Sequence, residues 1–290
     1  MLKDAMRERI LLLDGAMGTQ LLARGGKAPL ELLNVEQADV VGGVHRAYLE
    51  AGADVITTNT LCCDSLSLAE YGLSGRSYDI ALAGARVARA AADEFSATKP
   101  RYVVGSVGPT TRNLTLSTDV GADAVAEAYR TVVRGLIDGG VDAILVESAM
   151  DIKNICLAVE QVRAVSADIP IFVSAVLSRI VGRVASGATV EKFLEQLPLD
   201  DITAVGFNCT ASAANISASV ATLCDKSKRA TILYPSCDRL SSVKDFTSML
   251  EPLMREHKLN IVGGCCGTTP EHIKALRKVV DRWQPRRANI

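Results

Sequence analysis

Three cysteines offer the most distinctive chemistry in this sequence. Cys265 and Cys266 stand side by side in "IVGGCCGTTP", directly after two glycines, and Cys209 follows the apolar run "ITAVGFN". Three thiolates make a soft zinc site that leaves one coordination position open for a reacting ligand. The gap of 56 residues between Cys209 and Cys265 is not a compact metal-binding spacing. The spacing alone therefore leaves open that these are ordinary buried thiols, as we expect for Cys62, Cys63, Cys156 and Cys224.

Two acidic residues also end apolar runs. Asp14 closes "ILLLD" and Glu147 lies in "AILVESA". Burying an unpaired carboxylate is costly, so Glu147 is the less easily dismissed of the two as a functional residue. For Asp14 a role in a turn or a helix cap is the competing interpretation.

Eight short apolar runs must position these residues. They are "ILLLDG", "DVITTNT", "YVVGSVG", "AILVESA", "PIFVSAV", "ITAVGFNC", "ATILYPS" and "NIVGGCC". Continuous apolar runs are typical of parallel strands buried on both faces, and amphipathic stretches separate them. We therefore predict one (β/α)₈ TIM barrel domain over residues 1–290. In a barrel the C-terminal ends of the strands meet at one mouth, which would bring together Asp14, Asn59, Glu147, Cys209, Ser236, Cys265 and Cys266.

Boundaries and composition add further expectations. In "DAVAEAYRTVVRGLIDGG", Asp123 is predicted to cap a helix that ends at Gly139 or Gly140. The tail "DRWQPRRANI" is the predicted frayed end. The formal charge of −1 and the scattered basic residues argue against nucleic acid or an anionic membrane as partner. No signal peptide or membrane span is recognisable, so we expect a cytoplasmic protein without a disulfide framework.

Four motifs carry a resemblance to a known family. "LDGAMGTQL" at 13–21, "HRAYLEAGADVITTNT" at 45–60, "GFNC" at 206–209 and "GGCCGTTP" at 263–270 resemble the homocysteine S-methyltransferases. They are most similar to the homocysteine-binding module of cobalamin-dependent methionine synthase. The resemblance implies a barrel with one zinc ion per chain, held by Cys209, Cys265 and Cys266. It also implies that Asp14 and Glu147 contact homocysteine. Backbone N–H groups near Gly15–Ala16 and Ser106 are our candidates for holding the substrate carboxylate.

The implied reaction gives methionine. A thiol with a pKa of about 8.5 is mostly protonated at neutral pH, and zinc bound to the homocysteine sulfur would remove that proton. The thiolate would then attack an electrophilic methyl group. No general base is required, which suits a chain without histidine at a predicted strand end.

The sequence departs from the family pattern at two positions. Arg179 replaces a usual aspartate in "RIVGRVASG", and Ser236 replaces an asparagine that contacts the zinc in some relatives. The corrinoid signature D-x-H-x-x-G is absent. We therefore expect the donor to be methylcobalamin on a separate corrinoid protein, which we favour slightly, or a small molecule such as S-methylmethionine.

Other interpretations remain open. The acceptor could be another thiol. The glycines before Cys265 could bind phosphate in a sugar-phosphate isomerase or aldolase, against which the vicinal cysteines count. The protein could also be a non-catalytic binding subunit that retains the zinc site.

Overall fold

The computed structural model describes residues 1–209, 213–237 and 242–290. All eight predicted strands are present. Their bounds are β1 (Leu11–Leu12), β2 (Val55–Thr57), β3 (Tyr102–Val107), β4 (Ala143–Ala149), β5 (Ile171–Val176), β6 (Ala204–Asn208), β7 (Ala230–Tyr234) and β8 (Ile261–Val262). Every pairing between neighbouring strands is parallel.

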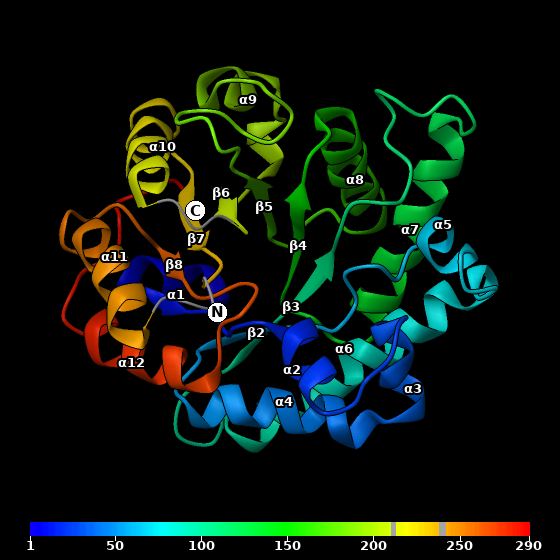
Figure 1. The fold of residues 1–290 in the computed structure, drawn as a ribbon, viewed down its shortest axis with the longest axis horizontal. Helices are drawn as coiled ribbons and strands as arrows, with labels where there is room; N and C mark the ends of the chain where they lie inside the picture. Colours follow the sequence, from blue (N-terminus) through cyan, green and yellow to red (C-terminus); the bar gives the residue numbers. More distant parts are fainter. Residues whose placement is uncertain (210–212, 238–241) are drawn as a thin grey trace.

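The sheet closes on itself. The strand order is β1-β8-β7-β6-β5-β4-β3-β2, and a parallel bridge between Leu13 and Val55 joins its two edges. Asp54 N–H donates to Leu12 O at 2.7 Å across the same seam. The predicted (β/α)₈ barrel is thereby confirmed, with helices outside the strands (Figure 1).

Helices follow the strands around the outside. They are α1 (Leu2–Glu8), α2 (Met17–Ala23), α3 (Leu33–Glu36), α4 (Ala38–Glu50), α5 (Ser65–Ala69), α6 (Ser77–Glu94), α7 (Ala122–Asp138), α8 (Ile152–Val165), α9 (Val190–Gln196), α10 (Ala213–Lys226), α11 (Val243–Arg255) and α12 (Pro270–Val280). Short 3₁₀ turns are η1 (Leu30–Leu32), η2 (Ser74–Arg76) and η3 (Leu199–Asp201). In the described part of the chain, none of the helices has the length and apolar character needed to cross a membrane.

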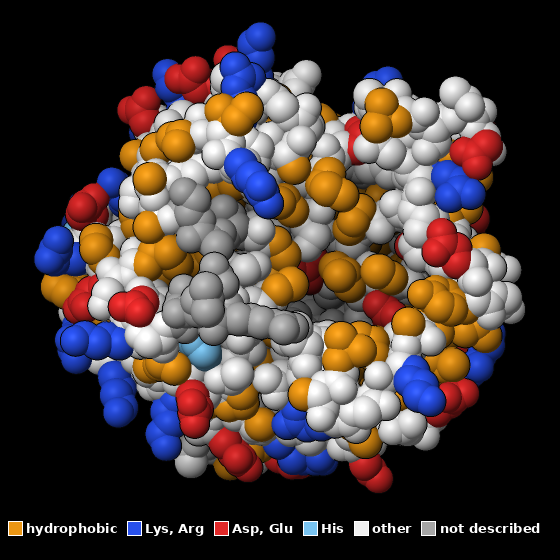
Figure 2. All heavy atoms as spheres, in the orientation of Figure 1, with side chains coloured by type: hydrophobic (Ala, Val, Ile, Leu, Met, Phe, Trp, Pro, Cys, Tyr) orange, Lys and Arg blue, Asp and Glu red, His pale blue; other side chains and the backbone are white. Residues whose placement is uncertain are grey.

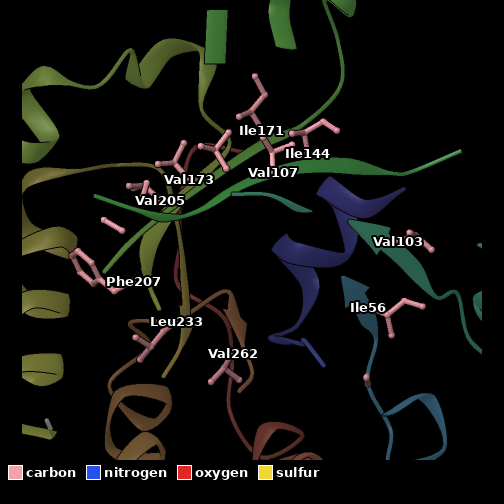
Figure 3. Packing of buried hydrophobic residues seen from close by; sticks show 14 of the residues in the cluster. Ile56, Val103, Val107, Ile144, Ile171, Val173, Val205, Phe207, Leu233 and Val262 are labelled. Carbon is pink, nitrogen blue, oxygen red and sulfur yellow. The ribbon is translucent and has the colours of Figure 1, made fainter. Parts of the chain in front are cut away.

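Alternation along the strands creates two apolar layers. One set of residues points outward and packs beneath the helices, as Ile144, Val205 and Leu233 do (Figure 3). The intervening residues, such as Leu145 and Phe172, fill the barrel interior. This explains why the strands are almost continuously apolar: both of their faces are buried.

Helix α1 and the C-terminal tail lie against the N-terminal ends of the strands. Leu2, Ala5 and Met6 of α1 join the interior cluster. In the tail, Arg286 N–H donates to Leu259 O at 3.0 Å and Asn289 N–H donates to Lys228 O at 2.8 Å. The predicted fraying of this tail is therefore wrong, because backbone bonds tie it to the barrel.

For α7 the structure confirms the predicted end of the helix but not the predicted N-cap. The helix ends at Gly139, and Gly140 adopts φ +88°. Its N-cap, however, is Gly121, and Asp123 lies within the first turn. Asp123 therefore sits near the positive end of the helix dipole without capping it.

Candidate active site

A cavity of about 460 Å³ opens at the C-terminal ends of the strands. Figure 2 shows hydrophobic side chains around a central hollow and acidic side chains within it. The residues on its wall include the predicted metal ligands Cys209, Cys265 and Cys266 and the predicted substrate contacts Asp14, Gly15 and Glu147. The topology has thus brought them to one mouth from β1, β4, β6 and β8.

The three predicted thiols form one cluster. Their sulfur atoms all lie within 4.8 Å of one another. Cys266 Sγ is 4.0 Å from Cys209 Sγ and 3.9 Å from Cys265 Sγ, whereas Cys209 and Cys265 are only 2.7 Å apart. Hydrogen bonds from Cys209 and Cys265 lower the pKa of Cys266.

The side chain of Asn208, at the end of β6, hydrogen-bonds the thiol cluster. Its side chain is completely buried at the end of β6, and its amide nitrogen donates to Cys209 Sγ at 3.4 Å and to Ser148 Oγ at 2.8 Å. Its amide oxygen accepts from Ser174 Oγ at 2.9 Å. In the sequence, Asn208 stands out only as part of "GFNC", because its role depends on β4 and β5 lying alongside.

Two backbone conformations near Asn208 are unusual. Ser148 has φ +56° and Cys209 has φ +51°, a region that residues with a Cβ rarely adopt. Ser148 lies at an irregularity in β4, where the pairing register shifts between Val146 and Ala149. Bulges and strained residues of this kind concentrate beside active sites, where they aim side chains. Here they turn Ser148 and Cys209 toward each other, with 4.0 Å between Ser148 Oγ and Cys209 Sγ.

The loop that carries Cys265 and Cys266 is packed tightly against the start of the chain. A Cβ on Gly264 would lie 2.5 Å from Thr268 Oγ1, and one on Gly263 would lie 2.6 Å from Leu13 Cβ. Both positions therefore require glycine, because the loop packs closely against other parts of the protein. Ser236 follows β7 and stands where the family pattern has an asparagine. It is half-buried and hydrogen-bonds Cys266.

Asp14 is a buried carboxylate at the mouth. It accepts from Thr57 N–H at 2.8 Å and from Thr57 Oγ1 at 3.1 Å. Burial raises its pKa well above the usual range, the bonds from Thr57 oppose this shift, and the nearby Glu147 adds to it. Asp14 is therefore no helix cap, because its oxygens bond to β2.

Glu147 is held by two hydroxyl groups. Ser106 Oγ donates to one carboxylate oxygen at 2.5 Å and Tyr234 OH donates to the other at 3.0 Å. Burial raises the pKa of Glu147, and these two bonds only partly oppose that rise. Ser106 and Tyr234 lie on β3 and β7, so sequence patterning could not have paired either with Glu147.

Two of the backbone N–H groups predicted to hold the substrate carboxylate are hydrogen-bonded within the protein. Ser106 N–H donates to Thr58 Oγ1 at 2.9 Å, and Ala16 N–H donates to Thr268 Oγ1 at 3.1 Å. Both backbone groups are thus engaged within the protein, and only Gly15 of the predicted carboxylate-binding set keeps that interpretation. Arg179 is exposed after β5 and lies outside the cavity wall.

Comparison with known proteins identifies the chemistry. The model of the family described as homocysteine S-methyltransferase matches residues 11–280. The chain belongs to the homocysteine S-methyltransferase family. This confirms the predicted family, and with it the prediction of a homocysteine S-methyltransferase enzyme.

Solved structures agree with this assignment. Homocysteine methyltransferase MmuM from Escherichia coli, in its metallated form, shares 26% sequence identity over 94% of this chain and 96% of that chain, with a TM-score of 0.80. The apo form of MmuM covers the same shares at 26% identity, with a TM-score of 0.73. The catalytic domain of a chitinase from Pyrococcus furiosus, at 11% identity over 95% and 96% of the two chains with a TM-score of 0.58, shows the shared barrel fold alone.

Proposed function

We propose that this methyltransferase binds homocysteine between a zinc ion on Cys209, Cys265 and Cys266 and the carboxylates of Asp14 and Glu147. One observation carries the proposal. A cluster of three thiols and two buried carboxylates share one cavity. A thiol with an ammonium group a few bonds away complements both halves.

The thiol cluster fits a zinc ion. At a Zn–S distance of about 2.3 Å, tetrahedral geometry separates the sulfurs by about 3.8 Å. The distances from Cys266 to its two partners, 3.9 and 4.0 Å, are close to that value. Cys209 and Cys265 must move apart by about 1 Å from their 2.7 Å separation. A zinc ion held there would lower the pKa of a thiol that enters its open position.

The protein orients the acceptor and leaves the proton to solvent. Asp14 and Glu147 bind the ammonium group, and Ser106 and Tyr234 fix the Glu147 carboxylate in place. No histidine, lysine or arginine lies among the described residues of the cavity wall. Because the carboxylates of Asp14 and Glu147 are assigned to the ammonium group, the thiol proton leaves for bulk water on binding.

The methyl group comes from a donor that lies against the same mouth. The sulfur attacks the methyl carbon in line, the bond between that carbon and the donor breaks, and methionine forms. The alternatives from the sequence, a corrinoid on a separate protein and a small molecule, are both compatible with this acceptor site.

Proton release tests this mechanism without knowledge of the donor. At neutral pH free homocysteine is mostly a thiol, and a metal ligand must bind deprotonated. Calorimetry of zinc-loaded protein, repeated in buffers of different ionisation heat, should show close to one proton released per homocysteine bound.

Two controls sharpen the result. Methionine has the same amino-acid end but no thiol, so it should bind more weakly and release almost no proton. Metal-free protein should release none with homocysteine. Tight homocysteine binding to the zinc form without proton release would rule out activation of the sulfur by the metal.

A further inference from the structure

Two neighbouring loops carry opposite ends of the proposed acceptor site. The β1 loop, residues 13–16, carries Asp14, and the β8 loop, residues 263–269, carries Cys265. The ladder between β1 and β8 has only two residue pairs, and a bond from Gly264 N–H to Asp14 O at 3.0 Å extends it to the mouth. Side chains must therefore help to set how far apart the two loops lie.

Thr268 joins the two loops through its hydroxyl group. Its Oγ1 accepts from Ala16 N–H at 3.1 Å and donates to Cys265 O at 2.7 Å. The Thr268 N–H also donates to Cys265 O, at 3.1 Å. Thr268 is completely buried, so water does not compete for these bonds and removal of the hydroxyl would take away the partner of the Ala16 amide.

Tyr48 of α4 ties the same loops together. It is completely buried, and its hydroxyl donates to Ala16 O at 2.8 Å and, at the longer distance of 3.2 Å, to Thr268 O. A Cβ on Gly15 would lie 2.7 Å from Thr268 Oγ1 and 2.8 Å from Tyr48 Cε1, so both side chains also fill the space against the β1 loop. We call Thr268 and Tyr48 the clasp.

The clasp lies behind the site and not in it. The cavity wall includes Ala16 and Cys265, whose backbone groups the clasp holds, but neither Thr268 nor Tyr48. Any effect of the clasp on a ligand must therefore pass through the two loops. Such effects are large when a site is closely fitted, because a displacement of about 1 Å caused by a distant change can cost about a hundredfold.

The separation of the two loops is a length that the acceptor must match. In the acceptor site proposed above, the sulfur lies at the thiol cluster and the ammonium group lies at Asp14 and Glu147. A chain of fixed length joins these two groups in the ligand. Free cysteine is one methylene shorter than homocysteine, so it cannot reach both ends unless the loops move. One methylene is typically worth about 10- to 200-fold in discrimination.

We propose that Thr268 and Tyr48 are positioning residues that fix the distance between the thiol cluster and Asp14, and that this distance selects homocysteine over free cysteine. The proposal rests on the proposed function and adds to it the residues that set the acceptor length. The clasp is specific to the side of the site where two loops meet, since Glu147 is held independently by Ser106 and Tyr234.

A Thr268→Val variant tests the clasp. It keeps the branched shape and removes the hydroxyl. Calorimetry of zinc-loaded protein gives the Kd of homocysteine and of free cysteine, and their ratio should be about ten or more in wild type. The ratio should fall at least fivefold in Thr268→Val, because loosened loops accept the shorter chain. Thr268→Ser restores the hydroxyl and should keep the ratio within twofold of wild type.

Two further variants separate positioning from a role in stability alone. Tyr48→Phe removes the second hydroxyl of the clasp and should lower the ratio in the same direction. Thr231→Val is the matched control: Thr231 is equally buried, and its Oγ1 accepts from Arg286 Nη1 at 3.2 Å on β7, away from the mouth. It should lower the urea midpoint and leave the ratio unchanged. Elemental analysis confirms about one zinc per chain in every sample.

The possible failures are distinguishable. If folded, zinc-loaded Thr268→Val and Tyr48→Phe both keep the wild-type ratio, the clasp serves only the fold and the acceptor site stands. An equal fall in Thr231→Val would show general loosening and would also overturn the proposal. If Thr268→Val does not fold, Tyr48→Phe decides by the same fivefold criterion. If wild type binds no homocysteine, the proposed function itself fails, and the clasp proposal fails with it.

Discussion

Both ends of the barrel bury carboxylates, but only the N-terminal end pairs its carboxylate with lysine and arginine side chains. At the N-terminal end, Asp54 is completely buried, with Lys99 Nζ at 2.5 Å and Arg277 Nη1 at 2.7 Å from its oxygens. Leu12 N–H adds a third contact at 3.0 Å. At the mouth, Asp14 and Glu147 receive only hydrogen bonds from hydroxyl and backbone groups.

The pKa shifts follow the same division. Burial acts to raise the pKa of Asp54, but Arg277, the Leu12 amide and Lys99 together lower it below the usual range. Burial raises the pKa of Asp14 and Glu147, and nothing in their surroundings reverses it. Asp54 thus receives its countercharge from the chain, whereas Asp14 and Glu147, which we propose to bind the ligand, do not. This fits the general division of barrels into a stabilising end and a catalytic end.

The largest expected effect is loss of metal at the mouth. Cys265→Ser and Cys209→Ser should each reduce zinc content from about one per chain to nearly none, because two thiolates and a hydroxyl form a much weaker site. Elemental analysis of purified protein measures this directly. Cys62→Ser is the control, since Cys62 belongs to the other vicinal pair and lies beside Glu31. Full zinc in both site variants would remove these cysteines from the metal site.

At the opposite end, Asp54→Asn should lower the free energy of unfolding and leave homocysteine binding unchanged. Removing the charge leaves Lys99 without this partner and leaves Arg277 with only Asp281, and breaking a buried ion pair typically costs about 3 kcal/mol or more. Urea unfolding measures the free energy, and homocysteine calorimetry should give an unchanged Kd for the folded variant. A large loss of affinity with full stability would contradict the division between the two ends.

Glu147→Gln should show the reverse behaviour. It keeps the shape of the side chain and removes the charge assigned to the ammonium group, so the Kd for homocysteine should rise about ten- to a hundredfold. Zinc content should stay at the wild-type level. Because the buried charge is uncompensated in the free protein, the variant should unfold at no lower urea concentration than wild type. Unchanged affinity in a zinc-loaded, folded sample would remove Glu147 from the ligand site.

Sequence patterning located the strands and the mouth residues, because both depend on local periodicity and on a topology that the periodicity implies. The contacts that finish the site were not predictable in this way. Asn208 serves the thiol cluster only because Ser148 and Ser174 come from neighbouring strands. The C-terminal tail has a polar composition typical of a frayed end, yet Arg286 binds four acceptors around the β7 entry, including Arg229 O and Thr231 Oγ1. Side-chain partners far apart in sequence leave no local signal.

The smallest expected effect is a pH dependence of stability with opposite signs at the two ends. Asp14 and Glu147 have raised pKa values in the folded state, so between pH 4 and those values the folded chain binds more protons and stability falls as pH rises. Each carboxyl adds a slope of at most about 1.4 kcal/mol per pH unit. Asp54, with its lowered pKa, loses its contribution only as pH falls below about 4. Urea midpoints measured across this range should therefore decline less with rising pH in Glu147→Gln than in wild type. Saturating methionine should also flatten the decline, because its ammonium group compensates the ionised carboxylates. Identical profiles with and without methionine would show that these acids do not meet the ligand.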